Sequence, residues 1–204
     1  MSAYIYIEGG GVGADSKEVD IRCREGFRKL LESCGFAAQK RMPRLVACGG
    51  RGKTFDGFKT AVKTASAGNF IGLWVDSEEP LANPEAAWQH LQARDGWAQP
   101  NGAIDEQVLF MTTCMETWFV ADHNALRDHF KAKLQVSALP PLNNLEARRR
   151  HDVQDDLIHA TRNCPNAYAK GTRSFEILGK LSPAMLTQHL PSFVRVRRIL
   201  NDRL

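Results

Sequence analysis

Four acidic residues follow predicted strands of this chain, and their placement suggests metal chemistry. Short apolar runs over residues 3–7 and 70–75 are typical of buried strands. Because parallel strands end at the same edge of an open sheet, acids placed there would lie close together and repel one another. A divalent cation relieves that repulsion, and carboxylate oxygens are the ligands that Mg²⁺ and Mn²⁺ prefer. The candidate metal ligands are Glu8, Asp76, Glu78 and Glu116.

A second segment, residues 168–176, places cations around a glycine at a predicted helix start. Lys170 and Arg173 could neutralise a scissile phosphate, and the Ser174 hydroxyl lies within the same segment. Lys170 is therefore a candidate catalytic residue, while Arg173 and Ser174 are candidate substrate-binding residues. The nearby basic run over residues 148–151 is interpreted as a solvated helix face.

Two glycine-rich loops offer competing interpretations. Residues 9–14 satisfy the dinucleotide pattern G-x-G-x-x-[GA] after a strand, although a flexible turn explains them equally well. Residues 47–54 match a relaxed phosphate-loop pattern between a strand and a helix, with alanine in place of the first glycine. In that loop Arg51 and Lys53 are candidate substrate-binding residues, and Asp76 would support Mg²⁺.

Strand and helix patterns alternate along the first two thirds of the chain and predict an α/β fold. Further strands are expected over 45–48 and 108–111, and helices over 19–33, 55–65 and 83–90. The order predicts a mostly parallel open sheet of about four strands with helices on both faces. Residues 1–122 are assigned to this core and 123–204 to a helical extension packed on it, with helices over 145–161 and 183–200.

Composition limits the class of protein. The 204 residues are 43% hydrophobic, enough for a folded core, and the net charge of +4 permits an anionic partner without requiring one. No apolar run is long enough to cross a membrane, and no signal segment is recognised, so a cytoplasmic location without membrane contact is expected. The five scattered cysteines fit neither a zinc site nor a disulfide framework.

Taken together, these motifs resemble the toprim fold of topoisomerases, primases and OLD-type nucleases. Glu8-Gly9 matches its glutamate motif, and Asp76-Ser77-Glu78 matches its D-x-D motif. Glu78 replaces the usual aspartate, and Asp15 comes later than the acid that normally follows the glutamate. The chain is also similar to stand-alone bacterial toprim-like proteins linked to phage-defence loci, in its I-E-G-G-G start, its M-E-x-W-F-x-A-D segment and its K-G-x-x-S-F segment.

The resemblance implies Mg²⁺- or Mn²⁺-dependent phosphodiester hydrolysis of DNA or RNA. It makes Glu8 a general base or metal ligand, Asp76 and Glu78 metal ligands, and Lys170 a stabiliser of the phosphate or leaving group. It also implies an ATPase partner protein in antiviral defence and is compatible with a homodimer. Two alternatives stay open: a P-loop-type hydrolase or kinase that uses residues 47–54, and a non-catalytic subunit that binds a partner.

Overall fold

Four short apolar runs form one parallel sheet at the centre of the molecule. The computed structural model describes residues 2–11 and 16–204. The sheet order is β2-β1-β3-β4, and every neighbouring pair is parallel. The predicted α/β class with a parallel open sheet is therefore confirmed. The strands are β1 (Ala3–Ile7), β2 (Arg44–Ala47), β3 (Phe70–Asp76) and β4 (Val108–Met111).

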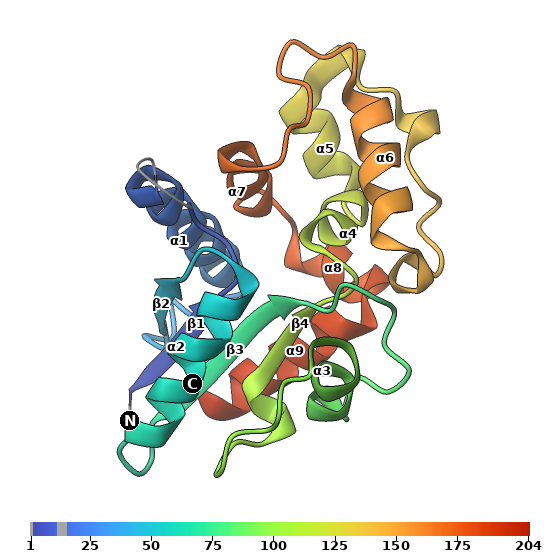
Figure 1. Cartoon of the computed structure of the whole chain (residues 1–204). Helices are drawn as coiled ribbons and strands as arrows, with labels where there is room; N and C mark the ends of the chain where they lie inside the picture. The colour runs from blue at the N-terminus through green and yellow to red at the C-terminus, as the bar shows by residue number, and fades with distance from the viewer. Residues whose placement is uncertain (1, 12–15) are drawn as a thin grey trace.

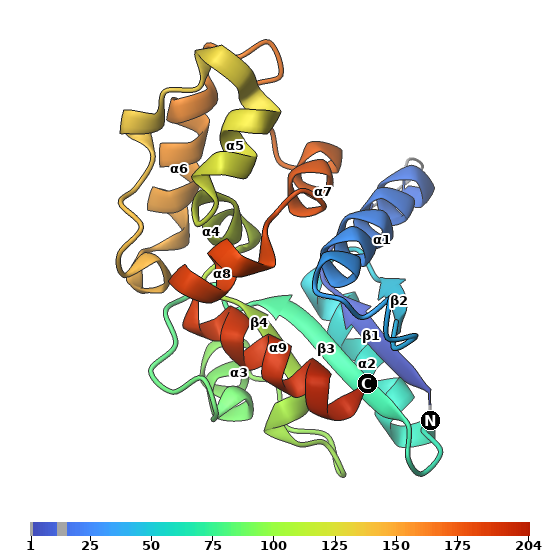
Figure 2. The same cartoon turned by 180° about the vertical axis from the view of Figure 1, so that it is seen from behind.

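Helices cover both faces of the sheet. Helices α2 and α3 lie on the face turned toward the viewer in Figure 1, and α1 and α9 lie on the opposite face, seen in Figure 2. Helices α4 to α7 stand beyond the carboxyl ends of the strands (Figure 1). Within the described residues the helices are α1 (Ser16–Ser33), α2 (Arg51–Thr64), α3 (Ala87–Asp95), α4 (Met115–Val120), α5 (His123–Phe130), α6 (Arg150–Thr161), α7 (Thr172–Leu178), α8 (Pro183–His189) and α9 (Pro191–Arg203).

The two faces of the sheet bury separate apolar cores. All seven residues of β3 are buried, which is why its sequence is a continuous apolar run without alternation. Alternate β3 residues point to opposite faces: Trp74 packs with α1, α4 and α9, whereas Leu73 and Val75 pack with α2 and α3. Asp76 follows Trp74 by two residues, so its side chain is directed toward the face that carries α1 and α4.

The C-terminal helical part is continuous with the sheet core. One apolar cluster extends from Ile5 in β1 to Leu200 in α9. Helix α9 returns across the sheet, where the buried Arg195 guanidinium donates from Nη1 to the carbonyl oxygen of Val108 at 2.7 Å. Residues 123–204 therefore pack on the α/β core as an extension of it.

Several helix boundaries differ from the prediction: α3 is Ala87–Asp95 instead of 83–90, and α6 begins at Arg150 instead of residue 145. The single helix expected over 183–200 is two helices, because Pro191 lacks an N–H and forces Leu190 into an extended conformation (φ −127°, ψ 97°). Helix α2 begins at Arg51 rather than near residue 55. This earlier start places Arg51 in the first turn of a rigid helix instead of in a glycine-rich turn.

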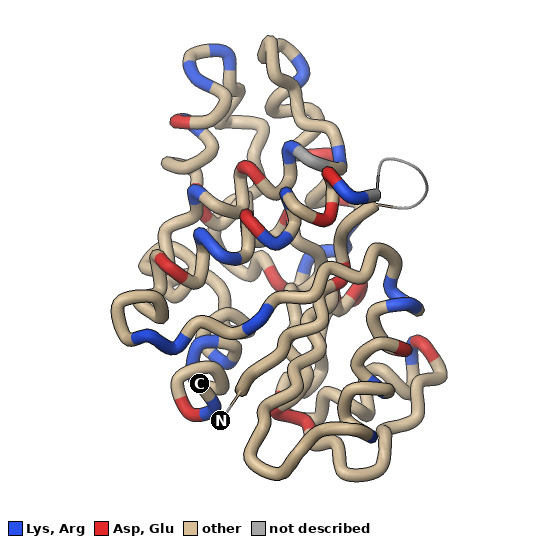
Figure 3. Tube along the Cα trace, turned by 90° about the vertical axis from the view of Figure 1, so that its left-hand side faces the viewer, with Lys and Arg blue, Asp and Glu red and all other residues tan. Residues whose placement is uncertain are grey.

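Charged side chains of α1 lie mostly on its surface, whereas several cysteines are buried in the core. Basic and acidic residues alternate along the exposed side of α1, as Figure 3 shows, and neutralise one another locally. All five cysteines are free thiols, and burial raises the pKa of Cys23 and Cys114 to about 12. Among the described residues, none of the helices has the length and apolar character needed to cross a membrane. Asp15 lies outside the described residues.

Candidate functional site at the strand ends

The candidate site lies at the carboxyl ends of β1 and β3, where the chain connections diverge. The helix that follows β1 packs on one face of the sheet, and the helix that follows β3 packs on the other. Such a switch point leaves a crevice outside the strand ends, the usual ligand position in open α/β sheets. Glu8 comes directly after β1, and Asp76 is the last residue of β3.

Parallel pairing holds these two acids side by side. Ile7 pairs with Trp74, and the Glu8 amide continues the ladder by donating to the Trp74 carbonyl at 2.8 Å. The Asp76 amide in turn donates to Glu8 Oε2 at 3.3 Å. The position of Glu8 relative to Asp76 therefore follows from strand register.

A cavity of about 240 Å³ opens at this crevice and collects residues from distant parts of the chain. Three carboxylates line it, those of Glu8, Asp76 and Glu116, together with the exposed ammonium of Lys170. The remaining walls come from glycines of the two loops and from α4 and α7. They are Gly9, Gly10, Val19, Gly49, Gly50, Met115, Gly171, Ser174 and Phe175.

Asp76 is the most unfavourably placed carboxylate of the site. Its residue is only 9% exposed, and its Oδ1 has no hydrogen-bond partner among the described residues. Burial raises the pKa of this carboxyl well above its ordinary value, and the negative charges of Glu8 and Glu116 raise it further. Lys170 and Arg51 act in the opposite direction but do not cancel the rise. The fold thus keeps a carboxylate where an added cation would be strongly favoured.

Arg51 holds Glu8 rather than reaching outward to a substrate. Its Nη1 donates to Glu8 Oε2 at 2.9 Å and to the Asp76 carbonyl at 2.6 Å. Its Nε and Nη2 form a fork on Asp95, at 3.0 and 2.7 Å, and its guanidinium lies 5.0 Å from the Trp97 ring centroid. The guanidinium that was predicted to bind substrate is therefore committed to two carboxylates. Lys53 lies two residues after Arg51 in α2; its side chain is exposed and does not line the cavity.

Glu116 is held by two residues that the sequence patterns did not identify. It lies in the first turn of α4 and is 1% exposed. Tyr168 donates its hydroxyl to Oε1 at 2.5 Å, and Gln154 donates from Nε2 to Oε2 at 3.2 Å. Burial raises the pKa of Tyr168, and the Glu116 charge adds to the rise. Tyr168 stands two residues before Lys170, so its segment was recognised although its role was not.

The segment around Lys170 is divided between the cavity and the supporting structure. The Ser174 hydroxyl lies 3.1 Å from the Tyr168 hydroxyl and accepts from the Gly171 amide at 3.3 Å. Ser174 is buried, so its hydroxyl supports Tyr168 and the start of α7. Arg173 is exposed, donates to the Ala167 carbonyl at 2.9 Å and does not line the cavity. Of the two cations in this segment, Lys170 lines the acidic cavity and Arg173 does not.

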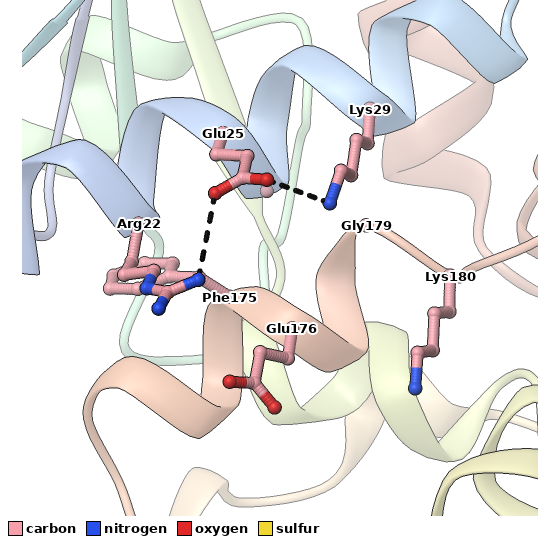
Figure 4. A pocket seen from close by; sticks show the side chains of 8 residues that line it. Arg22, Glu25, Lys29, Phe175, Glu176, Gly179 and Lys180 are labelled. Carbon is pink, nitrogen blue, oxygen red and sulfur yellow. Dashed lines mark ion pairs between the residues drawn. The ribbon is translucent and has the colours of Figure 1, made fainter.

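Close packing of α7 on α1 brings Lys170 to the sheet. A Cβ atom added to Gly26 would lie 2.5 Å from the Phe175 carbonyl oxygen, so only glycine allows this approach. Figure 4 shows the neighbouring surface, a cavity of about 220 Å³ between the two helices. Its α1 charges are paired with one another, because Glu25 lies 2.8 Å from Lys29 and 3.8 Å from Arg22. Glu176 and Lys180 line the other side of it.

Glu78 points away from the acidic cavity. It has a positive φ of 68°, pairs with Arg94 of α3 at 3.3 Å and also pairs with Arg150 of α6. It is absent from the residues that line the cavity. The D-x-D-like motif is therefore divided: Asp76 enters the site, and Glu78 holds two arginines beside it.

Some of the groups that a phosphate cradle could use are already occupied in the described parts of the two glycine loops. The Gly9 amide donates to the Gly49 carbonyl and the Gly49 amide donates to the Gly9 carbonyl, both at 2.9 Å. The Thr54 hydroxyl, which would face Mg²⁺ in a phosphate loop, instead donates to the Gly50 carbonyl at 3.1 Å. The two loops bind each other. Residues 12–14 of the dinucleotide-like pattern lie outside the described residues.

The described side chains do not form a complete set of ligands for a metal ion. Within residues 2–11 and 16–204, no three histidine, cysteine or carboxylate side chains are grouped closely enough to hold a metal ion. The acids that could approach one are Glu8 and Asp76, with Glu116 on the opposite wall of the cavity. The unpartnered Oδ1 of Asp76 is the atom that most clearly fits a cation.

Comparison with known proteins supplies a family but no activity. Comparisons with curated proteins and with solved structures give no significant match. A family model described as a domain of unknown function, DUF4276, matches residues 23–200, which include every residue that lines the cavity except Glu8, Gly9, Gly10 and Val19. The chain belongs to the DUF4276 family.

Proposed function

We propose that this protein is a metal-dependent nuclease that hydrolyses phosphodiester bonds of DNA or RNA with Mg²⁺ or Mn²⁺. The observation that carries the proposal is the buried Asp76 carboxylate, whose Oδ1 is unpartnered and whose neighbours in the cavity are two more carboxylates and one lysine. A site that gathers like charges at a ligand-binding crevice is favourable only when a cation is bound there. Glu8 and Asp76 would hold the metal, and the Glu116 carboxylate lines the same cavity.

The residues around the metal suit phosphate chemistry. When bound, a divalent ion supplies charge neutralisation at phosphate oxygens and lowers the pKa of a water ligand. Lys170 is exposed at the cavity mouth and can stabilise negative charge that develops on the phosphate or the leaving oxygen. Arg51 orients Glu8, and Tyr168 orients Glu116, so two of the three carboxylates have a fixed direction.

The wider setting of the proposal comes from the toprim-like motifs. An ATPase partner, a role in antiviral defence and a cytoplasmic location belong to the proposal through that resemblance. The proposal does not use the phosphate-loop alternative, because the Gly49 amide donates to Gly9 and the Thr54 hydroxyl donates to the Gly50 carbonyl instead of facing a ligand. A non-catalytic subunit stays as one outcome of the test.

The test compares cleavage and metal binding in matched variants. The purified protein is incubated with plasmid DNA and with tRNA, with and without Mn²⁺, beside Glu8→Ala and Asp76→Asn. Asp202→Asn, at an exposed position in α9, is the control for loss of one carboxylate. We expect Mn²⁺-dependent cleavage by the wild type and the control only. Equal cleavage by wild type and Glu8→Ala would refute the nuclease, and Mn²⁺ binding without cleavage would favour the non-catalytic subunit.

A further inference from the structure

An unbroken series of ion pairs leads away from the candidate site. Arg51 bridges Glu8 and Asp95, at 2.9 and 2.7 Å. Arg94, next to Asp95 in the last turn of α3, pairs with Asp95 and reaches Glu78 at 3.3 Å. The charges alternate in sign along the whole series. In spatial order its members are Glu8, Arg51, Asp95, Arg94, Glu78 and Arg150.

The middle of this ion-pair chain is shielded from solvent and its far end is open. The side chains of Asp95 and Glu78 are 9% and 10% exposed, so their interactions are only weakly screened by salt. Arg150, at the first position of α6, is 34% exposed and has Glu78 as its one ion-pair partner among the described residues. Arg150 was read from the sequence as part of a solvated face, but the structure ties it to the strand-end loop.

Glu78 holds Arg150 close to the candidate site along the chain. Glu78 is two residues beyond Asp76, which limits their Cα separation to about 7 Å. Asp76 and Lys170 would face one phosphate, and the guanidinium held by Glu78 would face the next. A planar guanidinium that is partly exposed is well suited to a backbone phosphate.

Binding at the two ends of the chain should be linked electrostatically. A phosphate on Arg150 competes for its guanidinium and leaves Glu78 freer to attract Arg94. Arg94 then releases Asp95, which can hold Arg51 more strongly and draw it from Glu8. Freed from Arg51, the Glu8 carboxylate is a better ligand for a cation. An anion at one end therefore favours a cation at the other, and the effect is reciprocal.

We propose that Arg150 binds a backbone phosphate of a nucleic-acid strand and that the ion-pair chain couples this binding to metal affinity at Glu8. The coupling rests on the metal site of the proposed function, whereas the phosphate contact does not. The two parts can therefore be tested separately.

The first experiment measures nucleic-acid binding without metal. A labelled single-stranded oligonucleotide is titrated in EDTA by fluorescence anisotropy, over a series of salt concentrations. Arg150→Ala should weaken binding and lower the slope of log K against log salt by about one. Arg162→Ala, an exposed arginine at the other end of α6, should match the wild type, and Arg150→Lys should recover part of the loss. Unchanged affinity in Arg150→Ala would overturn the phosphate contact.

The second experiment measures coupling by calorimetry of Mn²⁺ with and without a cleavage-resistant phosphorothioate oligonucleotide. The oligonucleotide should strengthen Mn²⁺ binding by roughly fivefold or more in the wild type. Glu78→Gln keeps Arg150 and the side-chain shape but breaks the ion-pair chain, so its Mn²⁺ affinity should no longer respond. An equal response in both proteins, or none in the wild type, would overturn the coupling. If the wild type binds no Mn²⁺ at all, the metal site and the coupling both fail while the EDTA titration still decides the role of Arg150.

Discussion

The candidate site has two halves that are built in different ways. Glu8 and Asp76 are set by neighbouring parallel strands and by one backbone-to-carboxylate hydrogen bond. Glu116 lies in α4, which begins four residues after β4 ends, and Lys170 precedes α7, which packs on α1. The strand-borne half is therefore local to the sheet, whereas the helix-borne half depends on contacts between distant segments. Variants that affect one half without the other can test this division.

The most severe disruption should come from the crossing of α1 and α7. Gly26→Val would insert a side chain where a Cβ atom alone would lie 2.5 Å from the Phe175 carbonyl oxygen. We expect it to displace α7, remove Lys170 from the cavity and lower the free energy of unfolding by about 2 kcal/mol or more. Urea unfolding followed by tryptophan fluorescence measures the effect. Gly52→Ala is the control, since it lies in α2 with nothing near its Cβ position, and it should be neutral or stabilising.

Residues of both halves were named from the sequence, but only the strand-borne half could also be placed from it. Its strands are contiguous apolar runs, and an acid follows each run, so the carboxyl edge could be located without knowing any tertiary contact. The orientation of the Arg51 side chain could not be predicted in this way. Its partner Asp95 is 44 residues away and is the last residue of α3, which was predicted to end at residue 90. The support of Glu116 by Tyr168 spans 52 residues and has no sequence pattern of its own.

The ionised Asp76 carboxylate should lower the free energy of unfolding but should be needed for Mn²⁺ binding. Its folded-state pKa is raised, so the folded protein binds its proton more tightly than the unfolded chain does. The contribution of Asp76 to stability is thus fully present below the unfolded-state pKa of about 4 and is lost as pH rises through the folded-state value. Asp76→Asn removes this pH-dependent loss. It should raise the free energy of unfolding at pH 7 by roughly 1–3 kcal/mol while abolishing Mn²⁺ binding.

Urea unfolding from pH 4 to pH 8 checks the sign of this prediction. The wild type should lose stability relative to Asp76→Asn as pH rises, and the difference should shrink when Mn²⁺ is present. Asp202→Asn should follow the wild type throughout, because its side chain is exposed. A variant less stable than the wild type at pH 7 would show that the Asp76 charge is already compensated without a metal.

A smaller loss is expected when Tyr168 is changed within the helix-borne half. Tyr168→Phe removes the hydroxyl that donates to Glu116 at 2.5 Å but keeps the ring beside Phe119. Loss of a hydrogen bond to a charged group should cost about 2 kcal/mol of stability, and a less well oriented Glu116 should weaken Mn²⁺ binding severalfold. Denaturation and calorimetry measure the two effects. Tyr4→Phe, in β1 on the opposite face of the sheet, should leave Mn²⁺ binding unchanged, and an equal change in both variants would remove Glu116 from the site.

The smallest effect separates two neighbouring cations of α2. Lys53 is exposed and outside the cavity, whereas Arg51, two residues earlier, is committed to Glu8 and Asp95. Lys53→Ala should change stability by less than about 0.5 kcal/mol and leave Mn²⁺ affinity unaltered. Arg51→Lys keeps the charge but cannot form the fork on Asp95, so it should change Mn²⁺ affinity. ATP binding that is present in the wild type and lost in Lys53→Ala would instead support the phosphate-loop interpretation, in which the Lys53 ammonium contacts the phosphates.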